Sequence, residues 1–518
     1  KIIDFEHLSA LGDIGRDFCD SFEPHGPGHG YLLDLKRRLR RKLGRNIHEY
    51  DAEWSKGRLS QAHIGTLPAS LDECLNLNTD GRRSPSLCED VWRQLSRVIL
   101  DEIARLKDQD ALESEASEHA AFGAERTKHF VGREDFLQKA TGYLGGASGE
   151  PLVVFGASGS GKSAFMARAA SDARRRFPNA VVVTRFIGAT PASSDGQALL
   201  AGVCQEISRR VEPGAEETSV DLENLSEELL KRLSLATRDK PIIVFLDALD
   251  QLSSAYNARS LRWLPSSLPA GARVVISTTP GDCLTALEKK VSRDSLTELQ
   301  PMSLDDGGKL LDRWLKDAGR TLQPGQRQDV LEGFARNGLP LYLKLAFEEA
   351  RRWPSFRSRA KLKRDVPGLL RDMFRRLEEH HGKVLVAHGL GYLATARNGL
   401  TEDELLDLLA RDREFYEDFV ANAHHDLPKA RGKFKVPVVV WARLYLDLEP
   451  YLTERNADGT SLLSFYHRQV NEAVVENYLA GTVKRHRHCS LAEYFGEQEL
   501  KTEKDGRQLP NVRKVAEL

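Results

Sequence analysis

The sequence has few cysteines, no long apolar run and no excess of charge of either sign. Its six cysteines lie far apart along 518 residues without a C-x-x-C pair, which argues against a disulfide framework and favours reduced thiols. No apolar run approaches the roughly 20 residues that cross a bilayer, and we recognise no signal peptide. The 75 Lys and Arg residues balance 76 Asp and Glu residues, so no global basic field indicates nucleic-acid binding. These absences favour a cytoplasmic protein without a membrane span.

Length and composition predict a globular chain of several domains. A chain of 518 residues is too long for one ordinary core and favours three or four domains. Its composition, 41% hydrophobic and 29% charged, is typical of globular proteins rather than of disordered ones. The sequence begins with Lys1 rather than Met and has no obvious closing element after Pro510. We therefore expect it to be part of a longer protein.

The most informative feature present is a glycine-rich loop. Gly156 to Ser163 read GASGSGKS, between the apolar run 151–155 and the helix-forming stretch 164–171. This is the phosphate-binding pattern G-x-x-x-x-G-K-[S/T] in its strand–loop–helix context, in which backbone N–H groups and a helix N-terminus surround a polyphosphate. We predict that Lys162 reaches the β- and γ-phosphates and acts in catalysis, and that Ser163 holds Mg²⁺. The predicted nucleotide-binding residues of the loop are Gly156, Ala157, Ser158, Gly159, Ser160, Gly161, Lys162, Ser163 and Ala164.

Five short β-rich runs alternate with helical patterns around this loop. Strands that alternate with helices predict a parallel sheet with right-handed crossovers and a ligand site at the carboxyl ends of the strands. The fold class that we predict is therefore an α/β P-loop NTPase with a five-stranded parallel sheet. The runs are Leu152–Phe155, Val181–Ile187, Ile242–Asp247, Arg273–Thr278 and, less sharply bounded, Leu296–Leu299.

The third run ends in a carboxylate that suits Mg²⁺. Five apolar residues, Ile242 to Leu246, lead directly into Asp247. A strand that delivers an Asp beside a phosphate loop provides the oxygen ligand that Mg²⁺ needs, directly or through water. An extra strand between loop and carboxylate separates this layout from that of small GTPases, and the sequence has no N-K-x-D guanine motif. The predicted cofactors are therefore ATP or ADP with Mg²⁺, held at Ser163 and Asp247.

The hydrolytic residues are less complete than the phosphate loop. Vigorous ATPases place Glu directly after the Mg²⁺-binding Asp, whereas this chain has Ala248. Asp250 is the best remaining candidate for orienting water, although a helix cap or an outer Mg²⁺ contact explains it equally well. Pro280 follows the fourth strand, at a position where some related ATPases carry Arg. We predict a slow ATPase that uses its nucleotide as a switch.

The rest of the chain predicts a helical domain and a winged helix. Residues 301–365 look helical, with Ser303 as a helix cap, and Thr401 and Glu404 form a capping box in the next domain. Strand-like runs at Val436–Trp441 and Leu462–Tyr466 precede a helix that begins after His467. The predicted domains are 1–112 (an N-terminal region next to an effector), 113–300 (nucleotide-binding), 301–365 (helical), 366–480 (winged helix) and 481–518 (a linker toward a C-terminal sensor).

Several motifs in order resemble a STAND NTPase of the NACHT type. They are FVGRE at 130–134, the loop at 156–163, LDALDQL at 246–252, GLP at 338–340 and FYHR at 465–468. The similarity is to the branch with nephrocystin-3-like and telomerase-associated vault-type proteins and bacterial antiviral relatives, and it covers about 113–490. The chain departs from the family at Gln251, often acidic there, and at Pro280. Both departures bear on the rate of hydrolysis rather than on nucleotide binding.

The resemblance implies roles for residues outside the phosphate loop. The segment of Phe130, Val131, Gly132 and Arg133 is expected to frame the adenine, and Pro340 to pack on the base. His467 of the winged helix is expected to touch the β-phosphate and to hold the ADP-bound resting state. The alternative interpretation of His467, which is less favoured, is a half-buried core histidine.

The two ends of the chain are less informative. Leu32–Leu43 predicts a basic amphipathic helix, for which a solvated face is a simpler explanation than nucleic acid or membrane. Glu89–Leu106 predicts a second amphipathic helix. The histidines and Cys74 before residue 112 have no recognisable catalytic spacing, so the reaction of an effector there cannot be identified. His486, His488 and Cys489 lack a second ligand pair and do not predict a zinc site.

Two functions of different classes agree with these motifs. The first is an ADP-held signalling switch that exchanges to ATP when a trigger, expected to be a protein, binds a C-terminal sensor. It would then oligomerise and activate an N-terminal effector, in innate immune or antiviral defence. The alternative is a DNA-binding initiator or transcription regulator, but the helix at 405–409 is surrounded by acidic residues. A housekeeping ATPase is disfavoured by Ala248.

Overall fold

The structure is a computed structural model in which the chain divides into two compact units, Lys1–Asp110 and Ala111–Leu518. It describes residues 27–43, 54–55, 58–59, 95–97, 110–212, 222–354, 362–422, 429–430, 433–457, 460–504 and 507–517. In the first unit, the expected basic helix is α3 (Pro27–Leu43), where Arg38 pairs with Asp34 at 2.9 Å. A two-stranded hairpin, β1 (Trp54–Ser55) and β2 (Arg58–Leu59), follows it. Of the helix expected at 89–106, the described part is the helical stretch 95–97.

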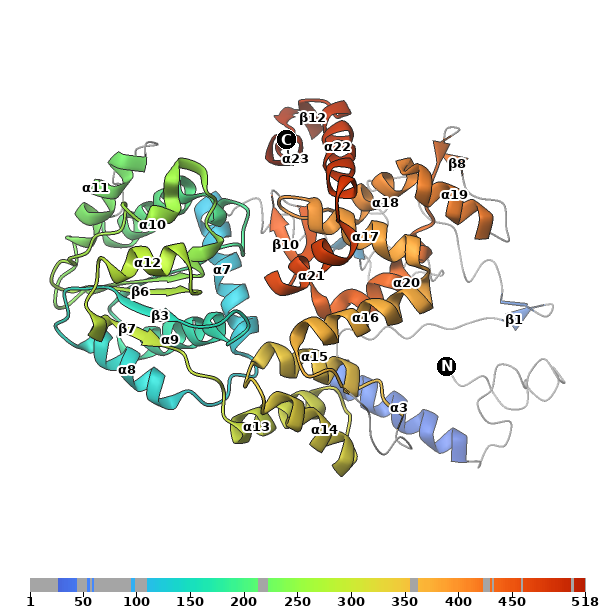
Figure 1. Ribbon diagram of the computed structural model, residues 1–518, viewed down its shortest axis with the longest axis horizontal. Coiled ribbons are helices and arrows are strands. Elements are labelled where there is room, and N and C mark those ends of the chain that lie inside the picture. Colours follow the sequence, from blue (N-terminus) through green and yellow to red (C-terminus); the bar gives the residue numbers. More distant parts are fainter. Residues whose placement is uncertain are drawn as a thin grey trace, which may run out of the picture. The chain divides into compact units, whose positions relative to one another are not determined.

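The second unit contains the predicted five-stranded parallel sheet (Figure 1). The strands lie in the order β4-β5-β6-β3-β7, so the strand that enters the phosphate loop lies inside the sheet, between β6 and β7. All residues of β4, β5 and β6 are buried, as expected for a parallel sheet covered on both faces. The strands are β3 (Leu152–Phe155), β4 (Val181–Phe186), β5 (Ile242–Asp247), β6 (Ala272–Thr278) and β7 (Leu296–Glu298).

Helices cover both faces of this sheet (Figure 1). One face packs against α10 (Gly196–Val211), α11 (Leu222–Leu233) and α12 (Asp282–Glu288). The other packs against α7 (Ala111–Thr127), α8 (Glu134–Gly145) and α9 (Lys162–Arg176). Two separate apolar clusters therefore hold the sheet in place, and the phosphate loop leaves it at the carboxyl end of β3.

Three helices follow the sheet and form the predicted helical region. They are α13 (Leu304–Asp317), α14 (Pro324–Phe334) and α15 (Pro340–Ala350). The predicted cap is present, because the Ser303 hydroxyl accepts from the amide of Asp306 at 3.1 Å. Pro340 begins α15, where its missing N–H costs no helical hydrogen bond.

The winged-helix region begins with α16 and ends in a wing hairpin and two helices. Its helices are α16 (Val366–His381), α17 (Lys383–Thr395), α18 (Glu402–Arg411), α19 (Arg413–Asn422), α20 (Val438–Leu448), α21 (Arg468–Tyr478) and α22 (Thr482–Glu497). The capping box of Thr401 and Glu404 at the start of α18 is present as predicted. Strands β10 (Leu452–Ala457) and β11 (Thr460–Phe465) pair antiparallel and lead into His467. One apolar cluster runs from the helical region through this whole region.

One predicted strand was wrong. The run Val436–Trp441 lies largely in the helix α20, not in a strand. Its β-branched residues favour an extended chain locally. However, Trp441, Leu444 and Leu448 recur at helical spacing and are all fully buried. Burial of that face outweighs the local preference of Val438 and Val439, which remain more than half exposed.

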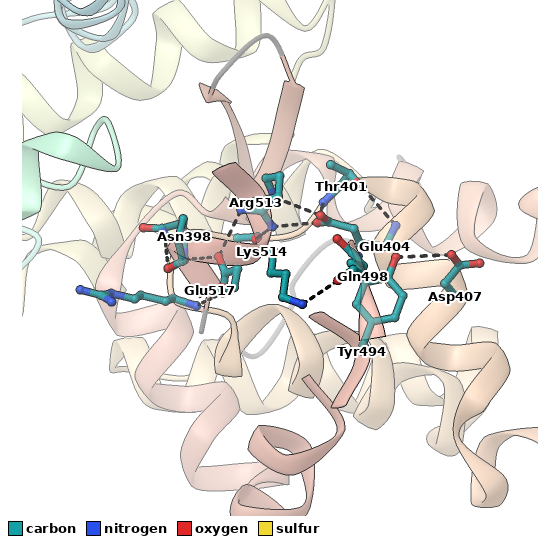
Figure 2. Close-up of polar contacts among 12 residues, drawn as sticks. Asn398, Thr401, Glu404, Asp407, Tyr494, Gln498, Arg513, Lys514 and Glu517 are labelled. Atoms are coloured by element: carbon teal, nitrogen blue, oxygen red, sulfur yellow. Dashed lines mark hydrogen bonds and ion pairs between the residues drawn. The ribbon is translucent and has the colours of Figure 1, made fainter. Parts of the chain in front are cut away.

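The described residues after 481 carry structure of their own, where a linker was expected. Beyond α22 lie a hairpin, β12 (Lys501–Lys504) with β13 (Arg507–Pro510), and the short helix α23 (Val512–Glu517). Figure 2 shows the side chain of Arg513 directed at Glu404 in the first turn of α18 and that of Glu517 directed at Asn398. No helix among the described residues is long and apolar enough to cross a membrane.

Candidate functional site

The phosphate loop has the backbone geometry that its glycines predict. Gly159 and Gly161 adopt left-handed conformations, with φ of 80° and 92°, which side-chain-bearing residues rarely adopt. Lys162 begins α9, and its ammonium donates to the carbonyls of Gly156 and Ala157, both at 2.9 Å. Burial lowers the pKa of Lys162, whereas the carboxylates of Asp247 and Asp250 act to raise it. A cation thus lies inside the loop, close to two carboxylates.

Asp247 and Ser163 lie together, as an Mg²⁺ site requires. Asp247 ends β5 and is only 2% exposed, and burial raises the pKa of its carboxyl. Hydrogen bonds from the hydroxyls of Ser163 and Ser277 and the charge of Lys162 oppose that shift. One carboxylate and one hydroxyl are hard oxygen ligands that fit Mg²⁺, which takes its other ligands from phosphate and water. No group of three or more His, Cys, Asp or Glu among the described residues could hold a metal by itself, the His486–Cys489 cluster included.

Asp250 lies at the same edge of the sheet but already has several partners. Its Oδ1 accepts from the amide of Thr279 at 3.0 Å and from the hydroxyl of Thr278 at 3.5 Å. Its Oδ2 accepts from Arg468 of the winged helix, also at 3.0 Å. Asp250 therefore ties the ends of β5 and β6 together and contacts a third element.

Ala248 stands in the position where a catalytic Glu was sought. It is buried and adopts a left-handed backbone conformation, with φ 62° and ψ 52°. Such a conformation costs a non-glycine residue about 1–2 kcal/mol. The amide of Ala248 donates to Ser277 at 2.9 Å, which holds the strained turn against β6. The methyl side chain itself offers no proton acceptor to water.

The segment 130–133 reaches the phosphate loop through Arg133. Its guanidinium donates to the carbonyl of Ser160 at 3.2 Å and to the carbonyl of Gln300. Gly132 and Arg133 are both left-handed, so the chain turns sharply before α8. Val131 is buried in the apolar cluster of the helical region. The carbonyl of Phe130 accepts from Arg313 of α13 at 2.8 Å, so the segment lies between loop and helical region.

Pro340 also lies against the loop. A Cβ atom added at Gly161 would be 3.6 Å from the Pro340 ring, and one at Gly159 only 2.8 Å from Leu341. The amide of Leu341 donates to the carbonyl of Gly159 at 3.3 Å. The start of α15 therefore packs directly on the phosphate loop.

His467 joins this group from the winged helix. Its Nδ1 accepts from the amide of Gln469 at 3.2 Å, so the residue caps α21. Burial, followed by the positive charges of Arg126, Lys162 and Arg468, lowers its pKa to about 3. The imidazole is therefore neutral at physiological pH, and Nε2 carries its hydrogen. A neutral N–H donor is available beside the cationic phosphate loop.

The predicted site residues thus come together from five segments of the chain, while their roles toward a nucleotide stay predictions. Sequence reasoning missed three side chains that join these segments. Arg126 of α7 donates to the carbonyl of Tyr466 at 3.0 Å, and Gln469 donates to the carbonyl of Ser158 at 3.2 Å. Arg468 is the third, through its pair with Asp250. Arg468 and Gln469 directly follow His467 in the sequence, and that proximity was the available signal; nothing marked Arg126.

Two family descriptions match the chain. Residues 129–277 match an AAA ATPase domain, and residues 359–485 match an NWD1-like winged helix-turn-helix domain. The first match contains the phosphate loop, Asp247 and Asp250. The second contains the wing hairpin and His467.

Several relatives share most of this chain but extend far beyond it. Human NACHT domain- and WD repeat-containing protein 1 is 32% identical over 74% of this chain and 25% of its own length. Mouse NACHT and WD repeat domain-containing protein 2 is 31% identical over 69% of this chain and 21% of its own. Mouse nephrocystin-3 is 25% identical over 52% of this chain and 20% of its own. The chain therefore spans about a fifth to a quarter of the length of these relatives.

Among solved structures, the Aeropyrum pernix ORC1 protein in complex with DNA aligns with 68% of this chain and 94% of its own, at 16% identity and a TM-score of 0.33. A likeness at that level carries no argument about function. The ordered motifs, the two domain matches and the NACHT relatives agree with one another. The chain belongs to the NACHT-type P-loop NTPases, with an AAA ATPase domain followed by an NWD1-like winged helix-turn-helix domain.

Proposed function

We propose that this chain is an ATP- and ADP-dependent signalling switch with slow hydrolysis. The observation that carries the proposal is the contact between the winged helix and the phosphate loop. Residues 466–469 meet three parts of the nucleotide domain: α7, the loop carbonyl of Ser158, and Asp250. A nucleotide bound at Lys162 would therefore lie between the two domains and would favour one arrangement of them.

In this proposal ADP holds the winged helix closed on the loop. Exchange to ATP favours an open arrangement only if the γ-phosphate interacts better with that arrangement. ATP with equal affinity for both arrangements would not shift the equilibrium between them. The open form would then oligomerise and activate an N-terminal effector, in innate immune or antiviral defence, after a trigger reaches a C-terminal sensor. NACHT-type homology supports a signalling ATPase, and the closed contact supports the role of ADP in it.

The alternative, a DNA-binding initiator, has no specific observation in its favour. The first turn of α18 carries Glu402, Asp403 and Glu404, so that helix would repel the phosphates of a duplex. We therefore do not propose it.

The experiment is to identify the nucleotide in purified protein and in Lys162→Ala. We expect ADP at close to one equivalent in the parent chain and a loss of most of it in the variant, because the ammonium is the main positive charge inside the loop. Lys309→Ala is the matched control, because Lys309 is exposed on α13 and pairs locally with Asp305 and Asp306. Nucleotide content is measured by chromatography after denaturation. An empty site together with fast multiple-turnover hydrolysis would contradict the switch.

A further inference from the structure

Arg468 of the winged helix forms an ion pair with Asp250, the carboxylate that is best positioned to orient water. Arg468 Nη1 donates to Asp250 Oδ2 at 3.0 Å, although 218 residues separate the two. The side chain of Asp250 is 16% exposed and that of Arg468 is 44% exposed. A second carboxylate, that of Glu472, accepts from Arg468 Nε at 2.8 Å and steadies the guanidinium one helical turn away.

Both oxygens of Asp250 are occupied in this arrangement. Oδ1 accepts from Thr279 and Thr278, which are fixed by the end of β6. Oδ2 accepts from Arg468. Among the described residues, no hydrogen bond from the nucleotide domain reaches this oxygen. A carboxylate can orient or deprotonate water only through an oxygen that accepts from that water in the right direction.

The nucleotide domain offers little else for this task. Ala248 has no acceptor, and Asp247 is fully buried and bonded to Ser163 and Ser277. Asp250 is therefore the remaining candidate for orienting water at this edge of the sheet, and one of its oxygens is bonded to the winged helix.

We propose that Arg468 is a positioning residue that withholds Asp250 from the attacking water, so that the closed winged helix suppresses ATP hydrolysis. This inference rests on the proposed function. When the winged helix moves away, Oδ2 is released while Thr279 keeps the carboxylate in place. One ion pair thus links the arrangement of the domains to the rate of hydrolysis.

The expected effect is modest because the pair is partly exposed. Exposed ion pairs contribute less than about 1 kcal/mol, which corresponds to at most about a fivefold change in rate. We expect Arg468→Ala to raise the single-turnover rate of hydrolysis of pre-bound, radiolabelled ATP about two- to fivefold. Pre-bound ATP removes nucleotide exchange from the measurement, and the full 518-residue chain is used.

Three further variants separate this role from a structural one. Arg468→Lys keeps the positive charge and should return the rate to near that of the parent. Glu476→Ala is the control on the same helix, because Glu476 is exposed, and it should leave the rate within about twofold. Asp250→Asn should hydrolyse slowly, and adding Arg468→Ala to it should produce no gain, because the two effects act through the same carboxylate.

Each outcome has a defined meaning. A slower rate in Arg468→Ala overturns the inference, because Arg468 would then contact the phosphates instead. An unchanged rate, or a gain that persists beside Asp250→Asn, also overturns it. ATP binding is measured separately by equilibrium dialysis in every variant. If ATP binds normally and the hydrolysis rate is unchanged, this inference alone is wrong. If ATP does not bind at all, the proposed function is wrong as well.

Discussion

At the scale of single residues, His467 is the side chain whose environment departs most from that of a free histidine. Its pKa is about 3 in the folded chain, compared with 6.5 for a solvent-exposed histidine, because burial and three nearby cations disfavour its charged form. Between these two values the exposed histidine binds a proton and the buried one does not. The closed contact is therefore favoured above pH 6.5 and loses stability as the pH falls through that window.

This difference predicts acid-promoted release of the nucleotide. We expect ADP to dissociate faster at pH 5.5 than at pH 7.5 in the parent chain, and His467→Gln, which cannot be protonated, to show a much flatter dependence. Stopped-flow displacement of a fluorescent ADP analogue provides the measurement. His488→Gln is the control, since that histidine is exposed on α22. If His467→Gln keeps the full pH dependence, another group controls release.

Gly159 illustrates a residue whose type follows from backbone geometry and packing together. Alanine there would adopt φ 80° at a cost of about 1–2 kcal/mol, and its Cβ would lie 2.8 Å from that of Leu341. We expect Gly159→Ala to lower the thermal midpoint by several degrees and to weaken nucleotide binding at least tenfold. Gly142→Ala is the control, because its Cβ would meet nothing within 4 Å in the helix α8. Calorimetry of both variants, with and without ADP, tests the contrast, and equal midpoints would refute it.

At the scale of secondary-structure elements, the sequence predicted the sheet better than the winged helix. The five strands and the capped helices follow from local patterns of apolar residues and caps. The strand expected at Val436–Trp441 was wrong because burial of Trp441, Leu444 and Leu448 was decided by distant elements. The contacts of Arg126, Arg468 and Gln469 could not be predicted either. Each joins residues that are far apart in the sequence. The position of Arg468 and Gln469 next to His467 was a signal that they lie near the site, but it did not indicate their partners, and Arg126 had no such signal.

The C-terminal helix α23 is held to the winged helix by charged side chains (Figure 2). Arg513 pairs with Glu404, which also closes the capping box of α18. Glu517 accepts from the backbone amides of Arg397 and Asn398, both at 3.0 Å. These contacts are partly buried, so they are screened less than ordinary surface pairs.

Removing the carboxylate of Glu517 should therefore release two specific amides. We expect Glu517→Ala to speed hydrogen exchange at Arg397 and Asn398 at least tenfold, because their acceptor is lost, with little change in the preceding helix α17. Val515→Ala is the matched control, because Val515 lies on the same helix and is 66% exposed. Exchange followed by mass spectrometry or NMR decides the point. Equal exchange in the two variants would show that α23 does not hold this turn.

At the scale of the whole second unit, its apolar clusters separate two bodies. The sheet has its own cluster on each face, whereas the helical region and the winged helix share one. Between these bodies the winged helix contributes polar contacts of residues 466–469. Hydrogen bonds that are lost on opening are replaced by hydrogen bonds to water at little net cost, whereas packed clusters resist separation. Opening should therefore occur at residues 466–469.

This arrangement predicts that ADP protects two distant segments together. In the parent chain, ADP should slow hydrogen exchange in both 156–163 and 466–471. In the double variant Arg126→Ala, Gln469→Ala, we expect ADP to protect the phosphate loop but to give a smaller gain at 466–471, because two of the connecting hydrogen bonds are gone. Arg413→Ala is the control, since that residue is exposed and pairs with Glu417 on the surface of α19. Undiminished protection of both segments would place the coupling elsewhere.

The turn that α23 holds also connects this helix with the wing strand β11. Leu400 and Leu463 exchange two backbone hydrogen bonds, at 2.8 and 3.1 Å, and Leu463 lies on the strand that ends just before His467. A pull on α23 therefore passes from Glu517 to the turn at 397–400, across this pair, and along β11 to the histidine. Because packed interiors hardly compress, the strand would transmit such a displacement rather than absorb it. A displacement of the short C-terminal helix would thus reach His467, the residue that caps α21.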